Sequence, residues 1–314
     1  MHSLVVGTRG SQLALRQTRE VVGRLERLHA GLSCRIEVIR TTGDRVRDLP
    51  LAAIGDKGVF VKEIEQALVD GRIDFAVHSA KDLPSEMDPA LCVAAYPERE
   101  NPADALVSQG HLLAQLPPGA RVGTSSVRRR AQLAHARPDL EIVDLRGNLD
   151  TRLAKLDRGE CDAIVVAYAG LVRMGWQSRA TQVLGYDVCL PAVGQGALAV
   201  QCRACVPVRD LLKTLDDPGA RTCVTAERAF LAGLRAGCQT PVAALATQKG
   251  QQVELDALVA ATDGSTIVRR SAMGDAAEPE VLGRRLADWF LESPARVLLE
   301  DARRGTAMRG MGAA

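Results

Sequence analysis

Short apolar runs alternate with helix-like spacing of apolar residues along much of the chain. The run at residues 4–6 leads into a Gly/Ser/Thr-rich turn at 7–11, and apolar residues at helical spacing follow over 13–25. Residues 121–126 repeat this turn, and the spacing then predicts a helix over 127–136. Strand–turn–helix units of this kind are typical of an α/β fold.

A second repeated pattern joins helix to strand. Leu68-x-x-Gly71-x-x-Asp74 and Leu156-x-x-Gly159-x-x-Asp162 match position for position. In both, a helix ends at Gly and a short apolar run follows, which predicts buried strands over 73–77 and 163–167. The chain therefore contains two similar α/β units.

The segments between the units predict a hinge. Residues 97–102 read as a linker out of the first unit, and residues 190–196 as the return. Two crossings between two lobes place a ligand in the cleft between them. The predicted lobes are 1–97 with 197–217, and 98–196. A polar, Gly-containing stretch over 41–58, before an amphipathic helix, predicts a lid.

From residue 218 the pattern changes to that of a small α+β domain, over 218–314. A helix is predicted over 223–234, followed by strands over 241–247, 252–260 and 265–271 with turns at 249–250 and 263–264. Two further helices are predicted over 278–291 and 294–304.

Composition narrows the functional classes. A net charge of +2 gives no global case for nucleic acid, and 3% aromatic residues leave few stacking platforms. We find no secretion-signal pattern and no apolar run approaching a membrane span of ~18 residues, so we expect a cytoplasmic protein with reduced cysteines. The spacing of Cys202, Cys205, Cys223 and Cys238 leaves a zinc site as a weak alternative.

The residues 78–84, His-Ser-Ala-Lys-Asp-Leu-Pro, carry the densest candidate chemistry. They follow a predicted buried strand, and residues past a strand's carboxyl end face the ligand crevice in an open α/β sheet. Asp82 beside Lys81 suggests acid–base or charge-stabilising work. The alternative is that Asp82 caps a turn and Lys81 is solvated.

Arginines cluster at the predicted strand-to-helix turns, which predicts a polyanionic ligand. They are Arg9, Arg128, Arg129, Arg130, Arg146, Arg152 and Arg173. We expect Arg130, Arg137 and Arg158 to be solvated. Cys238, on a Gly-flanked loop, is either a buried inert thiol or a nucleophile or attachment point.

Five motifs in order resemble the porphobilinogen deaminase (hydroxymethylbilane synthase) family: residues 78–84, 122–129, 145–148, 190–197 and 237–241. The resemblance covers nearly the whole chain. It implies an α/β fold of two periplasmic-binding-protein-like, doubly wound lobes joined by a hinge, plus a small C-terminal α+β domain with a three-stranded antiparallel sheet. It also implies a transferase that condenses four porphobilinogen molecules head to tail, with loss of ammonia, into hydroxymethylbilane.

The resemblance further implies roles for single residues. Asp82 matches the catalytic aspartate, and Cys238 the thioether attachment point of a dipyrromethane cofactor. The residues that match cofactor and substrate binding are Arg9, Ser11, Lys81, Ser126, Arg128, Arg129, Arg146, Arg152, Arg173, Gln195 and Phe60. His78 is expected to have a structural role rather than to transfer protons. The family implies a monomer that uses no metal and engages porphobilinogen and the growing polypyrrole chain, with no nucleic acid or membrane partner.

Two readings from other classes compete with this one. A non-catalytic two-lobed binding protein would explain the hinge and the arginines, but not Cys238 or the third domain. A Schiff-base enzyme would use Lys81 as its nucleophile.

Overall fold

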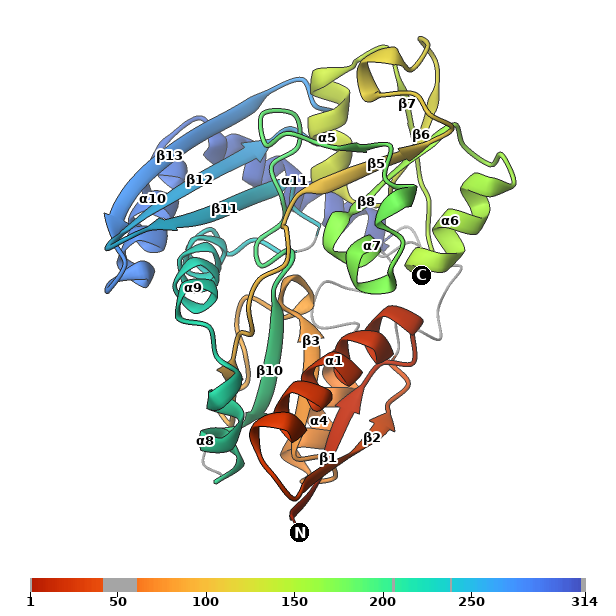
Figure 1. The fold of residues 1–314 in the computed structure, drawn as a ribbon. Coiled ribbons are helices and arrows are strands. Elements are labelled where there is room, and N and C mark those ends of the chain that lie inside the picture. Colours follow the sequence, from red (N-terminus) through yellow and green to blue (C-terminus); the bar gives the residue numbers. More distant parts are fainter. Residues whose placement is uncertain (1, 42–60, 205–206, 238, 312–314) are drawn as a thin grey trace.

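The computed structural model describes residues 2–41, 61–204, 207–237 and 239–311, with side chains described for residues 3–304 within these ranges. Three bodies are visible in Figure 1: one at the bottom that carries the amino terminus, one at the upper right, and one at the upper left. We call them lobe 1, lobe 2 and the third domain.

Lobe 1 is a mixed sheet in the order β2(Leu32–Val38), β1(His2–Thr8), β3(Phe75–Ser79), β10(Leu198–Arg203), β4(Leu91–Ala95). The first three strands are parallel, and β10 runs antiparallel to both of its neighbours. One face packs against α1(Gln12–Leu28) and α8(Val208–Leu212), and the other against α4(Lys62–Val69). Helices on both faces make this lobe doubly wound.

Lobe 2 repeats this order as β7(Glu141–Val143), β6(Arg121–Gly123), β8(Ala163–Ala167), β5(Asp104–Ser108), β9(Gln182–Val183). Here too the fourth strand is antiparallel to the third. Leu133 of α5(Val127–Ala136) packs on one face of the sheet. Residues of α6(Leu149–Asp157) and α7(Tyr168–Met174) pack on the other.

The repeated Leu/Gly/Asp pattern has a physical cause. In lobe 1 the Asp74 carboxylate accepts a hydrogen bond from the Val5 amide at 2.7 Å, and in lobe 2 the Asp162 carboxylate accepts one from the Arg121 amide at 2.6 Å. Each aspartate thus fixes the register of its strand against the neighbouring strand. Gly71 has a φ of 72°, a left-handed conformation that glycine adopts without strain.

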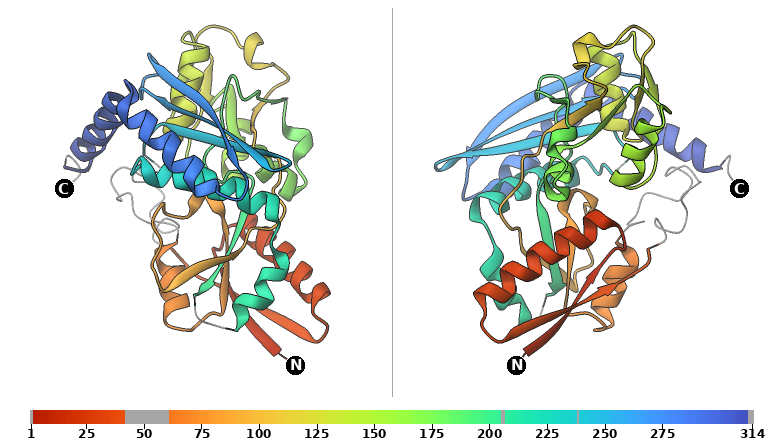
Figure 2. Two further views of the ribbon diagram at one scale, coloured as in Figure 1. Left: turned by 90° about the vertical axis from the view of Figure 1, so that its left-hand side faces the viewer. Right: turned by 45° about the vertical axis from the view of Figure 1, so that its right-hand side comes forward.

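Two chain segments connect the lobes. The chain leaves lobe 1 after β4 and enters lobe 2 as β5; it returns through residues 190–197 and enters lobe 1 as β10. Figure 2 shows these two connections running between the lobes. Helix α1 of lobe 1 also packs against α7 of lobe 2.

The third domain contains α9(Pro218–Gly233), the antiparallel strands β11(Val242–Lys249), β12(Gln252–Ala260) and β13(Ile267–Asp275), and then α10(Pro279–Glu292) and α11(Ala295–Met311). One face of its sheet packs on the helices, with Phe230 and Phe290 in edge-to-face contact. The other face packs on Ala131 and Leu190 of lobe 2. The third domain is therefore docked on lobe 2 through an apolar interface.

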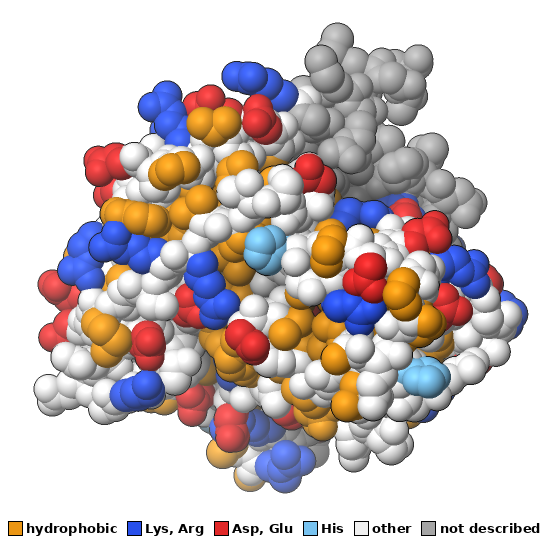
Figure 3. All heavy atoms as spheres, turned by 90° about the horizontal axis from the view of Figure 1, so that it is seen from above, with side chains coloured by type: hydrophobic (Ala, Val, Ile, Leu, Met, Phe, Trp, Pro, Cys, Tyr) orange, Lys and Arg blue, Asp and Glu red, His pale blue; other side chains and the backbone are white. Residues whose placement is uncertain are grey.

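Short 3₁₀ helices complete the fold: η1(Ala80–Asp82), η2(Leu113–Gln115), η3(Gln177–Arg179) and η4(Lys213–Leu215). None of the helices in the described part of the chain is both long and apolar enough to cross a membrane. On the face shown in Figure 3, basic and acidic side chains are interspersed rather than gathered by sign.

Candidate active site

The strand β3 carries the predicted catalytic segment to the edge of lobe 1. Its last residue, Ser79, accepts a hydrogen bond from Gln17 of α1 at 3.2 Å, which ties the strand end to the helix. The turn η1 follows at once and ends at Asp82. The side chains of Lys81 and Asp82 are both half-buried. The segment therefore follows the carboxyl end of β3, as predicted. That it faces a ligand stays a prediction.

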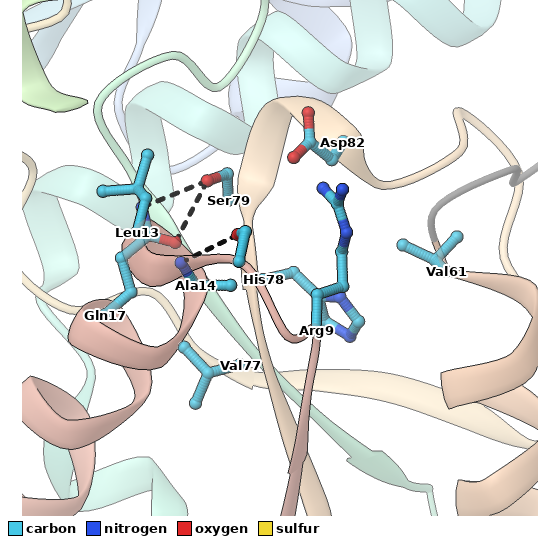
Figure 4. A pocket seen from close by; sticks show the side chains of 10 residues that line it. Arg9, Leu13, Ala14, Gln17, Val61, Val77, His78, Ser79 and Asp82 are labelled. Atoms are coloured by element: carbon cyan, nitrogen blue, oxygen red, sulfur yellow. Dashed lines mark hydrogen bonds between the residues drawn. The ribbon is translucent and has the colours of Figure 1, made fainter. Parts of the chain in front are cut away.

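A pocket of about 60 Å³ lies beside Asp82 (Figure 4). It is lined by the Asp82 carboxylate and by Arg9, Ser11 and His78 among others. In Figure 4 the Arg9 guanidinium points toward the Asp82 carboxylate. A carboxylate faced by a cation, in a pocket with room for water, can take and return protons while it stabilises positive charge.

His78 lies in the wall of this pocket and is buried. Burial, with a smaller contribution from the charge of Arg9, lowers the pKa of His78 to about 4. The imidazole is therefore neutral near pH 7 and does not alternate between protonation states there. This supports the structural role that the sequence assigned to His78.

Ser11 and Ser126 occupy matching positions at the amino termini of helices. The Ser11 hydroxyl accepts a hydrogen bond from the Ala14 amide at 3.2 Å, and the Ser126 hydroxyl accepts one from the Arg129 amide at 3.4 Å. Both are N-caps, whose acceptors satisfy amides that the helix leaves unpaired. Binding of a ligand by these hydroxyls stays a prediction.

Lobe 2 buries an ion cluster that the sequence did not predict. The fully buried Asp104, the first residue of β5, pairs with Arg128 at 2.7 Å and with Arg129 at 2.8 Å. Burial alone would raise the pKa of Asp104, but the two guanidinium groups hold it well below its usual range. Burial alone would lower the pKa of Arg128, yet Asp104 outweighs that effect and raises it. These arginines are thus held inside lobe 2 rather than extended into solvent.

Gln195, in the return segment, links this cluster to lobe 1. Its amide nitrogen donates to Asp104 at 2.8 Å and to the Pro102 carbonyl at 2.7 Å. Its amide oxygen accepts from Lys81 at 3.3 Å and from Arg129 at 3.5 Å. A single side chain therefore joins the Lys81–Asp82 segment to the buried ions of lobe 2.

Positive charge exceeds negative charge around this link. Among the described residues, five cations and three carboxylates lie close enough for their charges to interact. The cations are Lys81, Arg128, Arg129, Arg146 and Arg152, and the carboxylates are those of Asp82, Asp104 and Asp144. Burial, and after it the charge of Arg129, lowers the pKa of Lys81 to about 8 and that of Arg152 to about 10. A bound anion would relieve this repulsion.

The other predicted arginines lie in different surroundings. Arg173 donates to the Gly196 carbonyl at 2.8 Å and lies 3.7 Å from Glu20 of α1, so it bridges lobe 2, the return segment and lobe 1. Arg158 is exposed, as expected. The expectation that Arg130 and Arg137 are solvated is wrong. Both are half-buried and donate to backbone carbonyls, Arg130 to Ile142 and Arg137 to Leu113 and Leu116, because the guanidinium reaches groups remote in sequence.

A second buried ion pair, also missed from the sequence, lies where the three bodies meet. Arg99, in the outgoing linker, pairs with Glu227 of α9 at 2.6 Å. The same carboxylate accepts from the Gly194 and Ala246 amides at 2.7 and 2.8 Å. Arg99 also donates to the Gln195 carbonyl at 2.9 Å. The pair thus fixes both interlobe connections against the third domain.

The described residues suit a group that bears several carboxylates. The excess of cations supplies a charge match, and the Nε atom of Arg128 is buried without a hydrogen-bond partner in the described structure. Cys238 and Phe60, predicted as attachment point and lid contact, lie outside the described residues. Within the described ranges, no cluster of His, Cys, Asp and Glu side chains could hold a metal ion.

The chain thus forms a two-lobed α/β protein with a third α+β domain. Near Asp82, at the meeting of the two lobes, cations outnumber carboxylates. A model of the porphobilinogen deaminase dipyrromethane cofactor binding domain matches residues 4–207, and a model of the porphobilinogen deaminase C-terminal domain matches residues 221–292. The chain belongs to the porphobilinogen deaminase family, whose members are tetrapyrrole-building transferases with a dipyrromethane cofactor.

Curated relatives agree over almost the whole chain. A porphobilinogen deaminase of Roseiflexus sp. (strain RS-1) is 53% identical over 95% of this chain and 98% of its own length. One from Moorella thermoacetica is 48% identical over 96% of this chain and 97% of its own length.

Solved structures with a related outline include a Bordetella pertussis BvgS VFT2 domain, which is 16% identical, with a TM-score of 0.40, over 68% of this chain and 86% of that chain. The methionine binding protein MetQ is 13% identical, with a TM-score of 0.44, over 68% of this chain and 89% of that chain.

Proposed function

We propose that this chain condenses four porphobilinogen molecules head to tail, with loss of ammonia, into hydroxymethylbilane, and that Asp82 is its catalytic residue. The observation that carries the proposal is the half-buried Asp82 carboxylate at the end of η1, which follows β3; it lines a pocket and is surrounded by an excess of cations. The family membership supplies the reaction, and the geometry supports the assignment of roles.

Asp82 has two tasks in this proposal. As an anion it stabilises the positive charge that develops on the pyrrole nitrogen of a substrate that has lost ammonia. As an acid and base it donates a proton to the leaving amine and accepts one from the carbon at which the new bond has formed. The pocket beside the carboxylate is where these groups would lie.

The cations hold the acetate and propionate arms of the substrate. Lys81, Arg146 and Arg152 are half-buried and positively charged, so they can meet a carboxylate at modest desolvation cost. Ser11 and Ser126 add hydroxyl groups at helix termini, where the dipole also favours anions. The remaining proposed contacts are Arg9, Arg128, Arg129, Arg173, Gln195 and Phe60.

The family's dipyrromethane group, when bound, supplies the pyrrole end to which new units are joined. Cys238 would hold it through a thioether bond, and the cations above would pair with its carboxylates. We also propose that the lobes are 1–97 with 197–217 and 98–196, that the third domain is 218–314, and that the protein acts as a cytoplasmic monomer.

The test combines activity with intact mass. Purified protein given porphobilinogen should release ammonia and form hydroxymethylbilane, and its mass should exceed that of the polypeptide by two linked pyrrole units. Cys238→Ala should lose both the extra mass and the activity, whereas Cys161→Ala, a buried cysteine in lobe 2, should keep both. An active protein with the bare polypeptide mass would refute the attachment, and an inactive protein that carries the extra mass would refute the reaction.

A further inference from the structure

Two cysteines lie directly opposite each other in the lobe 1 sheet. Cys202 of β10 is the ladder partner of Cys92 of β4, and the two strands are antiparallel. Their sulfur atoms are 3.8 Å apart, which is contact distance. Both side chains belong to the apolar face that α8 covers. None of the residues proposed for the reaction takes part in this contact.

The backbone geometry suits a covalent bond between these sulfurs. Directly opposed residues of an antiparallel pair have Cα atoms about 4.5–5.5 Å apart. Disulfides span Cα separations of about 4.4–6.8 Å, with a sulfur–sulfur bond of about 2.0 Å. The sulfurs therefore need to approach each other by less than about 2 Å, and the Cα separation expected for opposed residues lies within the range that disulfides span.

The two thiols differ in access. Cys202 is fully buried, whereas Cys92 is half-buried and within reach of a small reagent. Burial, followed by the effect of Cys92, raises the pKa of Cys202 to about 12, so Cys202 is a poor first nucleophile. The attack on an external oxidant therefore falls to Cys92, and Cys202 is placed to resolve the product.

We propose that Cys92 and Cys202 form a redox-sensitive dithiol that closes to a cross-strand disulfide when a low-molecular-weight disulfide oxidises the protein. With glutathione disulfide as oxidant, the Cys92 thiolate attacks one sulfur and releases one glutathione thiolate. Cys202 then gives up its proton and attacks the Cys92 sulfur, which releases the second glutathione. The two protein thiols are oxidised by two electrons, and glutathione disulfide is reduced to two thiols.

The position of the bond determines its effect. The bond would close a ring over residues 93–201, which contains the lobe 2 sheet and both interlobe connections. A link across so long a loop restricts the unfolded chain and stabilises the folded one. The connections begin after Ala95 and end before Leu198, so the link leaves them free. We expect oxidation to raise the thermal unfolding midpoint by several degrees. Activity should change by less than about twofold, which corresponds to a change in activation free energy smaller than RT.

The experiment uses the full-length protein with its cofactor. It is incubated with glutathione disulfide, then denatured in urea in the presence of iodoacetamide so that buried free thiols are blocked as well, and digested with trypsin without reductant. We expect a peptide of residues 82–99 linked to one of residues 180–203, and a higher unfolding midpoint that dithiothreitol reverses. Arg203 separates Cys202 from Cys205 in this digest.

Three variants make the outcome specific. Cys92→Ser and Cys202→Ser should each lose the linked peptide and the rise in midpoint. Cys34→Ser, which removes the half-buried thiol of β2, should keep both. The proposal is overturned if Cys92 and Cys202 stay fully alkylated after glutathione disulfide and also after the smaller oxidant diamide. It is equally overturned if Cys92 keeps a bound glutathione and no disulfide to Cys202 forms. A disulfide from Cys92 to Cys189, found both in the Cys202→Ser protein and in the wild type, would also overturn it.

Discussion

The two lobes share a strand order but place opposite kinds of residue at the ends of matching strands. In lobe 1, β10 begins with Leu198, which pairs with Ser79 at the end of β3. In lobe 2, β5 begins with Asp104, which pairs with Ala167 at the end of β8. The same ladder position is thus apolar in one lobe and a buried carboxylate in the other.

The first turns of the helices α1 and α5 show the same difference, apolar in lobe 1 and charged in lobe 2. Counted from the capping serines, Leu13 and Ala14 of α1 correspond to Arg128 and Arg129 of α5. Leu13, Ala14 and Leu198 of lobe 1 thus correspond to the ion-paired Arg128, Arg129 and Asp104 of lobe 2. After the ends of β3 and β8 the charged residues are in lobe 1 instead. Lys81 and Asp82 of lobe 1 correspond there to Ala169 and Gly170 of lobe 2.

This difference separates framework from chemistry. Asp104 is buried and saturated by arginines and Gln195, so it is fixed in position and charge. Asp82 is half-buried and lines a pocket. Burial and saturation of partners, rather than the acidic residue type, indicate which aspartate can react.

The largest effect is expected from Asp104→Asn. Removing this charge leaves two buried guanidinium groups short of a partner, and breaking a buried ion pair costs about 3–5 kcal/mol. The free energy of unfolding, measured by urea denaturation, should fall by that amount. The matched change in lobe 1, Asp82→Asn, should alter it by less than about 0.5 kcal/mol. Equal losses of unfolding free energy in the two variants would contradict the distinction drawn between Asp104 and Asp82.

The stability of the protein at acid pH should also depend on the Asp104 carboxylate. The pKa of Asp104 is depressed in the folded state, so its contribution is present above the unfolded value of about 3.9 and is lost as pH falls toward the folded value. Wild-type stability should therefore decline between about pH 4 and pH 2 more steeply than that of Asp104→Asn. Parallel curves in circular dichroism titrations of the two proteins would contradict the assignment.

A smaller effect is expected from Lys81 on the lobe 1 side. Its pKa in the ligand-free protein is lowered to about 8, so its charge is lost as pH rises through that value. The KM for porphobilinogen should rise by roughly tenfold from pH 7 to 9, since the charged fraction of a group with a pKa of about 8 falls about tenfold over that range. Lys81→Arg keeps its charge, and its KM should stay flat. An identical rise in both proteins would place the titrating group elsewhere.

The smallest effect is expected from Arg158→Ala. Arg158 pairs with Glu160 at 2.7 Å, but its side chain is 59% exposed, and surface pairs contribute about 0–1 kcal/mol. Thermal unfolding should shift by no more than a degree or two. A loss comparable to that of Asp104→Asn would mean that burial does not decide the contribution of lobe 2 arginines.

Periodicity predicted the regular elements well. The expected helix over 127–136 and the strands over 163–167 and 252–260 match the observed bounds. The first helix of the third domain begins at Pro218 instead of Cys223, because small and polar residues conceal its first turn and Asp217 caps it. The Leu/Gly/Asp repeat was predictive because each aspartate has a local, repeated backbone partner.

Long-range polar pairs were not predictable in the same way. Asp104 stands at the head of an apolar run, and its partners are 24 and 25 residues distant along the chain, which no local pattern specifies. Arg99 and Glu227 come from different bodies. The available signal for Asp104 was its acidic side chain at the start of a buried strand, since a buried charge demands a partner.

The most direct test measures Asp82→Asn and Asp104→Asn side by side in two assays, ammonia release from saturating porphobilinogen and unfolding by urea, with cofactor loading checked by intact mass. We predict that Asp82→Asn loses about 10²–10⁴-fold in rate with unchanged stability, and that Asp104→Asn loses about 3–5 kcal/mol of stability. An Asp82→Asn protein that carries the cofactor and turns over within about threefold of wild type, a change far below that expected for a general acid–base, would contradict the account.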